Sequence, residues 1–377
     1  MKPRTRYAWW ATVAALLTLG SAGAAQAGAP SSQQARIAAA ADAVVAAGVP
    51  GVVVYSRNGP RTIRIARGSD DLATKRPMTS SDRFRIGSVT KTFTATVVMQ
   101  LVREGKLALG DTVEQHLPGL VPNGQAITYR ELLSHTSGLP DYFSNKRIFA
   151  PYAAGHLTYT WSHRAIVSIS AADKPLFAPG ERLKMAYSNT GYYILGLTVE
   201  RITGHSLASE LARRIFQPLG LHDTELPATN RPAGRYSHGY TGDFGKQQQD
   251  VSILSPSILW AAGGIVSTPA DVAAFYRALF QGRLLPLALV HQMQSAEFSI
   301  AHTHGRQAVG LGLFRASLPC GTTWGHNGDL PGYTTQAYSS PNADRQAVIA
   351  VNVGEEAAFT PAQQEALAGL TLHAYCG

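Results

Sequence analysis

The sequence predicts an α+β fold in which N- and C-terminal segments build one antiparallel sheet flanked by helices. Strand-like runs lie at 51–55 and 62–66, and strands alternate with turns from 310 to 353. The chain between these ends is rich in helical patterns, such as the apolar spacing over 90–104. Strands at both ends with helices between them favour a helix-covered sheet with a mostly helical inserted region.

The first part of the sheet is expected to follow a helix. Residues 35–47 have an amphipathic pattern that Gly48 ends. Turn-forming residues at 57–60 separate the first two strand-like runs, which predicts a hairpin. The long helix over 90–104 then stops at Gly105.

Capping residues predict where further helices begin. A capping box begins at Thr128, and another helix is expected near Asn189. Thr268 and Thr360 each precede a proline at the first helical position and a polar residue at the third.

The first 27 residues are predicted to be a secretory signal peptide. Basic residues at the start precede an apolar run over 7–19, and small residues lead to Ala27 as in a signal-peptidase site. The run is shorter than the roughly 20 residues that span a bilayer, which disfavours an uncleaved anchor. We therefore expect a secreted or cell-wall-associated protein with no stable membrane span.

Residues 28–377 are predicted to form a single catalytic unit. Its composite α/β region would come from about 31–95 and 268–377, and its mostly helical region from about 96–267. The sequence shows no repeat, low-complexity tract or linker that would divide it.

The basic net charge makes nucleic acid a candidate partner, because 33 Lys+Arg against 24 Asp+Glu give a formal net charge of +9. Removing residues 1–27, which hold three basic and no acidic residues, lowers this to +6. The remaining basic residues are scattered, as on a solvated surface. We expect no nucleic-acid partner, a small-molecule or peptide substrate, and a monomer.

The two cysteines, Cys320 and Cys376, are expected to form a disulfide, since an even pair in an exported protein favours one. The bridge would tie the last helix to the sheet. In the chain-entropy model, closing this loop would stabilise the folded protein by about 4 kcal/mol.

Several kinds of catalytic site are excluded by their missing motifs. The sequence has no Gly-x-Ser-x-Gly, phosphate loop, dinucleotide fingerprint or His-Glu-x-x-His. His302 and His304 lack a third metal ligand nearby, so loop histidines are the favoured interpretation. We expect neither a metal nor a cofactor.

Ser88 and Lys91 are the first catalytic candidates. Three residues apart at the start of a helix, they share a face, so the amine can reach the hydroxyl. The helix N-terminus and burial both disfavour the ammonium, which would let Lys91 act as a base. Such a pair also occurs by chance in a chain of this length.

Two further motifs follow in the chain. Tyr187 offers a phenol that can relay a proton, and Asn189 an amide that can hold a substrate carbonyl. His326 stands at a strand end where its imidazole could face outward, and Gly328 lets backbone approach a ligand. Each motif alone has a structural explanation, a loop tyrosine or an Asn-Gly turn, but the ordered set does not.

Together these motifs resemble those of the penicillin-recognising serine hydrolases, specifically the class C β-lactamase and D-alanyl-D-alanine carboxypeptidase group. The resemblance covers nearly the whole chain after residue 27 and implies a β-lactamase/transpeptidase-like fold. The histidine of the third motif and the cysteine pair are most similar to secreted actinobacterial DD-carboxypeptidases. The motifs are Ser88-Val89-Thr90-Lys91, Tyr187-Ser188-Asn189 and His326-Asn327-Gly328.

The resemblance implies a role for each residue. Ser88 would be the acylated nucleophile and Lys91 would accept its proton. Tyr187 would pass a proton to the leaving amine, and Asn189 would hold the substrate amide. His326 stands where most relatives have lysine. The backbone N–H groups of Ser88 and Asp329 would form the oxyanion hole. Within the stretch 133–139, His135 is expected to pack a turn and do no catalysis.

The binding of a substrate carboxylate is where the chain departs from the family pattern. Carboxypeptidases of this type present a hydroxyl in the third motif and an arginine on the preceding strand. Here the motif has Asn327 beside Gly328, and Phe314 stands where the arginine is expected, with Arg315 one place along. A shift of one residue reverses the face of a strand side chain.

The resemblance implies an exported acyl-serine hydrolase that cleaves D-alanyl peptides of peptidoglycan precursors and is acylated by β-lactams. An esterase, a β-lactamase or a D-amino-peptidase of the same family is the alternative. A catalytically inactive binding protein is a remote third alternative. It is disfavoured because the catalytic set is complete, with Ser88, Lys91 and Tyr187.

Overall fold

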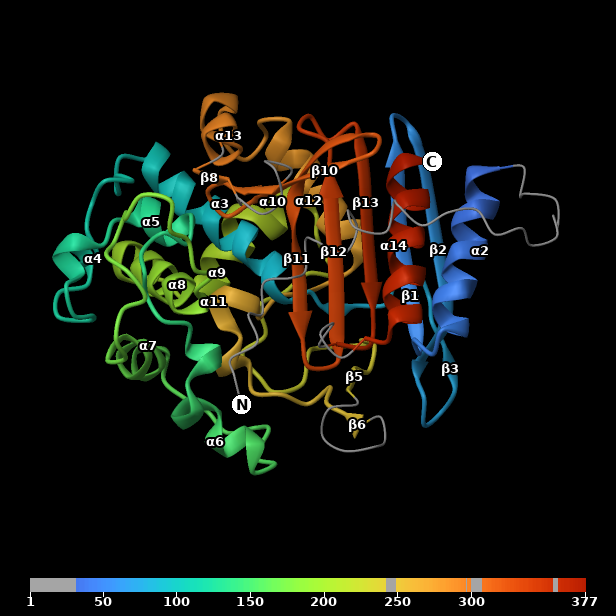
Figure 1. Cartoon of the computed structure of the whole chain (residues 1–377), viewed down its shortest axis with the longest axis horizontal. Coiled ribbons are helices and arrows are strands. Elements are labelled where there is room, and N and C mark those ends of the chain that lie inside the picture. Colours follow the sequence, from blue (N-terminus) through green and yellow to red (C-terminus); the bar gives the residue numbers. More distant parts are fainter. Residues whose placement is uncertain (1–31, 242–248, 296, 300–306, 355–358) are drawn as a thin grey trace.

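The computed structural model describes residues 32–241, 249–295, 297–299, 307–354 and 359–377 (Figure 1). The expected signal peptide, together with His302 and His304, lies outside the described residues. The centre of the molecule is a nine-stranded sheet in the order β3-β2-β1-β13-β12-β11-β10-β9-β8. Its strands are β1 Gly51–Asn58, β2 Arg61–Asp71, β3 Arg76–Pro77, β8 Phe298–Ser299, β9 Gln307–Val309, β10 Phe314–Leu318, β11 Gly321–Leu330, β12 Tyr333–Ser339 and β13 Arg345–Val351.

The two ends of the chain meet in the middle of this sheet. β1 pairs with β2 as a hairpin and with β13 on its other side, with Val54 opposite Ile349. The pairings are antiparallel, from β2–β3 at one edge to β8–β9 at the other. The predicted antiparallel sheet, built from N- and C-terminal segments, is confirmed.

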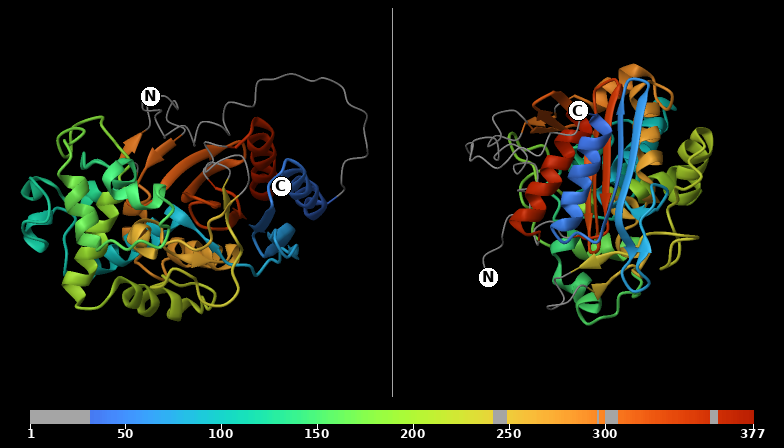
Figure 2. Two further views of the ribbon diagram at one scale, coloured as in Figure 1. Left: turned by 90° about the horizontal axis from the view of Figure 1, so that it is seen from below. Right: turned by 90° about the vertical axis from the view of Figure 1, so that its right-hand side faces the viewer.

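Helices cover both faces of the sheet (Figure 2). α2 (Gln33–Ala46) and α14 (Pro361–Cys376) pack side by side on one face, and α12 (Pro269–Phe280) packs on β1, β12 and β13 from the other. On the first face Ile37, Leu367 and Leu370 are buried in the same cluster as strand residues such as Val54 and Ile349. The outer helices are therefore stabilised by the sheet, since each buries its apolar side against it.

The chain between the two parts of the sheet is mostly helical, as expected. Its longest helices, α3 and α8, are buried over most of their length and pack on each other. The elements are η2 Gly87–Val89, α3 Thr90–Arg103, α4 Val113–His116, η3 Gly124–Ala126, α5 Tyr129–Leu133, η4 Tyr142–Ser144, α6 Lys146–Ala153, α7 His163–Ala171, α8 Asn189–Thr203, α9 Leu207–Leu211, η5 Ala212–Phe216, α10 Gln217–Leu219, η6 Pro256–Ile258, α11 Trp260–Gly263 and α13 Leu287–Met293.

Two small two-stranded sheets complete the fold. β4 (Phe84–Arg85) pairs with β7 (Val266–Ser267), and β5 (Tyr240–Thr241) pairs with β6 (Gln249–Asp250). The β4–β7 pair matters for the site, because β4 leads directly into η2 and α3.

The helix caps are where the sequence placed them. Thr128 and Thr360 form capping boxes at the starts of α5 and α14, and the Thr268 hydroxyl accepts from the N–H of Asp271 at the start of α12. Ser188 caps α8 in the same way, by accepting from the N–H of Gly191. These local signals need no tertiary context, because the cap and its backbone partners lie within one turn.

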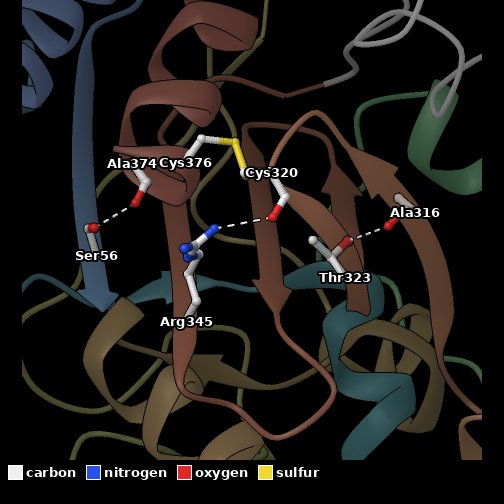
Figure 3. Close-up of a disulfide and its surroundings, with 7 residues drawn as sticks. All are labelled: Ser56, Ala316, Cys320, Thr323, Arg345, Ala374 and Cys376. Atoms are coloured by element: carbon white, nitrogen blue, oxygen red, sulfur yellow. Dashed lines mark hydrogen bonds between the residues drawn. A yellow bond between two sulfur atoms is a disulfide. The ribbon is translucent and has the colours of Figure 1, made fainter. Parts of the chain in front are cut away.

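The predicted disulfide is present in the structure (Figure 3). Cys320, between β10 and β11, is bonded to Cys376 at the end of α14. The Ser56 hydroxyl donates to the carbonyl of Ala374, and the Arg345 guanidinium donates to the carbonyl of Cys320. The bridge therefore ties the last helix to the β10–β11 hairpin.

Within the described parts of the chain, no helix has both the length and the apolar character needed to cross a membrane.

Candidate active site

Ser88 lies at the start of the long buried helix α3. The pairing of β4 with β7 directs the chain into η2, where Gly87 has a left-handed φ of +53° that favours glycine. Ser88 itself is partly exposed, whereas the residues around it are buried. The hydroxyl is thus offered to solvent from a rigid element.

Lys91 is fully buried beneath Ser88, and its amine has three partners. Nζ lies 3.0 Å from Ser88 Oγ, 2.6 Å from Asn189 Oδ1 and 2.7 Å from the carbonyl oxygen of Ala262. The last two oxygens can only accept hydrogen bonds. A neutral amine has two N–H groups, so both are used by these acceptors and its lone pair is directed at the Ser88 hydroxyl.

The electrostatic environment supports this neutral form. Burial, as the largest cause, lowers the pKa of Lys91 well below its usual value of 10.5, while nearby Asp141 opposes the shift. An amine that is neutral near pH 7 and within hydrogen-bond distance of a hydroxyl is suited to take its proton. The predicted Ser88–Lys91 contact is therefore present.

Tyr187 lies over the same amine. Nζ of Lys91 is 4.8 Å from the centroid of the Tyr187 ring. The ring stacks on His135, with the centroids 4.3 Å apart, and the N–H of Ser188 donates to His135 Nδ1 over 3.1 Å. His135 thus packs against Tyr187 and Ser188 of the second motif, which fits its expected structural role. Its imidazole ring lies against the phenol ring of Tyr187.

Asn189 is held by the protein at both ends of its amide. Oδ1 accepts from Lys91, while Nδ2 donates to Asp141 Oδ1 and Oδ2 over 3.0 and 3.2 Å. The sequence suggested that Asn189 holds the substrate amide. That role stays a prediction, and in the structure the two ends of the amide contact Lys91 and Asp141.

His326 does not face outward as the sequence suggested, because only 3% of it is exposed. Its Nδ1 donates to the carbonyl of Asn327, which leaves Nε2 as an acceptor with no hydrogen-bond partner among the described residues. Burial lowers the pKa of His326 to about 3. The imidazole is therefore neutral, and its ring centroid lies 6.2 Å from that of Tyr187.

The backbone of β11 packs closely against the segment that carries Ser88. A Cβ placed on Gly328 would lie 1.9 Å from the carbonyl oxygen of Ile86 and 3.0 Å from the backbone nitrogen of Ser88. A Cβ on Gly87 would lie 2.9 Å from the backbone nitrogen of Asp329. Glycine at both positions therefore brings together the two N–H groups expected to form the oxyanion hole.

On strand β10 the ring of Phe314 reaches the site. Its centroid lies 4.9 Å from that of His326 and 6.2 Å from that of Tyr187. Because successive side chains of a strand alternate, Arg315 projects from the opposite face to Phe314. Asn327, on the neighbouring strand β11, is partly buried. An aromatic ring thus occupies the place where a carboxylate-binding arginine is expected.

Two participants were missed by the sequence reasoning. Asp141 follows the stretch 133–139, and its only local signal is a capping position before η4. Ala262 contributes a backbone carbonyl from α11, for which no side-chain pattern exists. Among the described residues there is no group of three or more His, Cys, Asp or Glu placed to hold a metal ion.

Comparison with protein families matches residues 34–370 to the family described as Beta-lactamase. Among curated proteins, the chain is 27% identical over 307 residues to penicillin-binding protein 4* of Bacillus subtilis, covering 76% of this chain and 64% of that protein. It is 32% identical over 210 residues to penicillin-binding protein 4 of Amycolatopsis lactamdurans, covering 53% and 51%. The chain thus spans less than two thirds of either relative.

Similar solved structures cover nearly the whole chain. A D-stereospecific amidohydrolase from Streptomyces sp. superposes with a TM-score of 0.81 at 33% identity, over 91% of this chain and 99% of the other. A D-amino acid amidase from Ochrobactrum anthropi, complexed with L-phenylalanine amide, gives a TM-score of 0.78 at 27% identity, over 91% and 98%. Both share the α+β fold described above.

Proposed function

The chain belongs to the beta-lactamase family of penicillin-recognising serine hydrolases, and we propose that it hydrolyses D-aminoacyl amides and peptides whose leaving group carries no charge. It is a serine hydrolase of this fold. The finer assignment rests on one observation, the ring of Phe314 at the place where a carboxypeptidase of this kind needs an arginine. The names of the two similar structures, an amidohydrolase and an amidase with D-specificity, support it.

The site residues have the following proposed roles in acylation. Lys91 accepts the proton of Ser88, and Oγ attacks the carbonyl carbon of the substrate. The N–H groups of Ser88 and Asp329 stabilise the oxyanion, and removing one such donor from a serine hydrolase typically costs about 3–4 kcal/mol in the transition state. Tyr187 gives its proton to the leaving nitrogen and receives the proton held by Lys91, the C–N bond breaks, and the amine departs and leaves an ester on Ser88.

Deacylation reverses these roles with water as the nucleophile. A water molecule on the open side of Ser88 loses a proton to the neutral Lys91 amine, directly or through the Tyr187 hydroxyl, and attacks the ester. The C–O bond breaks, Ser88 regains a proton, and the D-amino acid or peptide is released. His326, buried and neutral, lies beside Tyr187 as a hydrogen-bond acceptor in this scheme.

The leaving-group side of the site distinguishes two substrates. An aromatic ring desolvates a carboxylate without pairing it, which is costly, but accepts an amide or an alkyl group. Phe314 therefore favours a D-amino acid amide over a peptide that ends in a free carboxylate. The second candidate is the D-alanyl-D-alanine carboxypeptidase expected from the sequence, supported by the penicillin-binding relatives, and it requires Arg315 or another cation to reach the substrate.

The cellular location is part of the proposal. We propose that residues 1–27 direct export and that the enzyme acts outside the cell or at the cell wall on D-amino-acid-containing material. The Cys320–Cys376 disulfide supports this location, because such bonds persist in oxidising compartments.

The test compares turnover of D-alanyl-D-alanine peptide, its C-terminal amide, a simple ester and the L-alanyl amide. The proposal expects the D-amide to exceed the free acid by at least about tenfold in kcat/KM and the L-amide to react poorly. A faster free acid would establish the carboxypeptidase, and equal rates for acid, amide and ester would favour an esterase. A labelled penicillin that forms an adduct on the wild type and none on Ser88→Ala would confirm the nucleophile.

A further inference from the structure

Asp141 is linked to the proposed base through Asn189, whose amide contacts Asp141 at one end and Lys91 at the other. Three N–H groups converge on its carboxylate: the backbone N–H of Phe143 and the backbone and side-chain N–H groups of Asn189, over 3.0–3.2 Å. Each is a donor, and a carboxylate is the side chain that accepts from all of them.

The segment that carries Asp141 is fixed to the start of α8. The Thr190 hydroxyl donates to the carbonyl of Pro140 over 2.7 Å, and the N–H of Tyr142 donates to the same hydroxyl over 3.0 Å. Residues on both sides of Asp141 are thus held by Thr190, next to Asn189. The carboxylate and the amide have a defined mutual position.

The orientation of the Asn189 amide determines where the Lys91 lone pair points. With Nδ2 on Asp141, Oδ1 must face Lys91 and take one N–H, while the carbonyl of Ala262 takes the other. If the amide were rotated by half a turn, its N–H would face Lys91 instead. The lone pair of a neutral amine would then accept from Asn189 and no longer from the Ser88 hydroxyl.

We propose that Asp141 is a positioning residue for catalysis, which acts through Asn189 to direct the Lys91 lone pair at Ser88. Asp141 touches neither the substrate nor the reacting atoms, so its effect must pass through the amide. This inference rests on the proposed role of Lys91 as the base, and it holds for any acyl donor that Ser88 attacks.

The informative variant is Asp141→Asn. An asparagine here replaces Oδ2, which lies 3.2 Å from Asn189 Nδ2, by an N–H group, so two donors face each other unless the Asn189 amide rotates. Rotation restores a hydrogen bond between the two amides and misdirects the lone pair of Lys91. Since a well-placed general base contributes about 10²–10⁴-fold, we expect kcat for acylation to fall about 100-fold with little change in KM. Asp141→Ser, which can still cap η4 but is too short to hold the amide, should lose a similar factor.

A double-mutant cycle separates positioning from a structural role. Asn189→Leu fills the space of the amide and leaves Asp141 nothing to orient, so adding Asp141→Asn should lower kcat less than about threefold further. The matched control is Asp173→Asn, which alters an exposed Asp that also accepts from an asparagine, Asn145, over 2.8 Å. It should leave kcat unchanged. Thermal unfolding of each variant checks that the fold is kept.

The assay uses two acyl donors, D-alanine p-nitroanilide and p-nitrophenyl acetate. A full 100-fold loss in the Asn189→Leu background, or normal acylation by Asp141→Asn and Asp141→Ser, would overturn the positioning role. If the wild type is acylated by the ester but does not hydrolyse the anilide, the proposed D-aminoacyl specificity fails, while the ester still tests Asp141. Acylation by neither donor would overturn both.

Discussion

Lys91→Met tests whether the buried amine is neutral in the folded protein. The change removes the donor to two buried oxygens, Asn189 Oδ1 and the carbonyl of Ala262. Each buried acceptor left without a partner costs about 1–3 kcal/mol, so the variant loses about 2–6 kcal/mol of stability on this ground.

The same change removes an opposing cost. A lysine with its ordinary pKa of 10.5 must lose its proton to be buried neutral, which costs about 1.4 kcal/mol for each pH unit below that value. At pH 7.5 this amounts to about 4 kcal/mol and at pH 9.0 to about 2 kcal/mol. The variant should therefore differ little from the wild type at pH 7.5 and be less stable by about 2 kcal/mol more at pH 9.0.

The direction follows from proton binding. Because the pKa of Lys91 is lowered on folding, the unfolded chain binds more protons than the folded one between the two pKa values. The contribution of the neutral amine is therefore largest above 10.5 and is lost as the pH falls toward the folded pKa. The variant lacks this dependence.

Urea unfolding of both proteins at several pH values from 7.5 to 9.0 measures the difference between their free energies of unfolding. Lys106→Met serves as the matched control, because it makes the same substitution at a lysine whose side chain is half exposed. If the difference in free energy of unfolding between Lys91→Met and the wild type does not change with pH, Lys91 is charged in the folded state and its assignment as the base is refuted. Acylation of the variant should also fall by about 10²–10⁴-fold.

Three further predictions concern neighbouring features. Replacing both Cys320 and Cys376 by serine should lower the free energy of unfolding by about 4 kcal/mol, measured by urea titration, because a disulfide across 56 residues restricts the unfolded chain. Gly328→Ala should reduce acylation about 100-fold or more, since its Cβ would lie 1.9 Å from a backbone oxygen, whereas Gly369→Ala, with open space around it, should leave acylation unchanged. His326→Gln should leave the shape of the kcat/KM profile between pH 5 and 8 unchanged, because the pKa of His326 is lowered to about 3; a lost limb in that range would contradict this.

Local features of the fold were predictable because their causes are local. Thr268 and Thr360 cap helices through atoms of their own first turn, and the 57–60 turn joins two neighbouring strands. The hairpin is tighter than expected, since β1 extends to Asn58 and β2 begins at Arg61. Strand lengths depend on the pairing of neighbours, which the sequence pattern does not contain.

The motif residues were predictable for a related reason. Ser88 and Lys91 are placed three apart by helical geometry, so their contact needs only the helix. The outward imidazole expected for His326 was wrong, because burial of that strand position depends on rings brought from elsewhere, such as Tyr187 and Phe314.

The α+β architecture, the cysteine pair and the three motifs could be read from the amino-acid sequence, because caps, periodicity and helical spacing act over a few residues. The oxygens that surround the Lys91 amine depend on long-range packing, since Ala262 and Asn189 are 171 and 98 residues away from it in the chain. The tertiary structure also decided that Phe314 faces the site and that Asp141 holds the amide. Those contacts depend on strand register and helix packing, which no local pattern encodes.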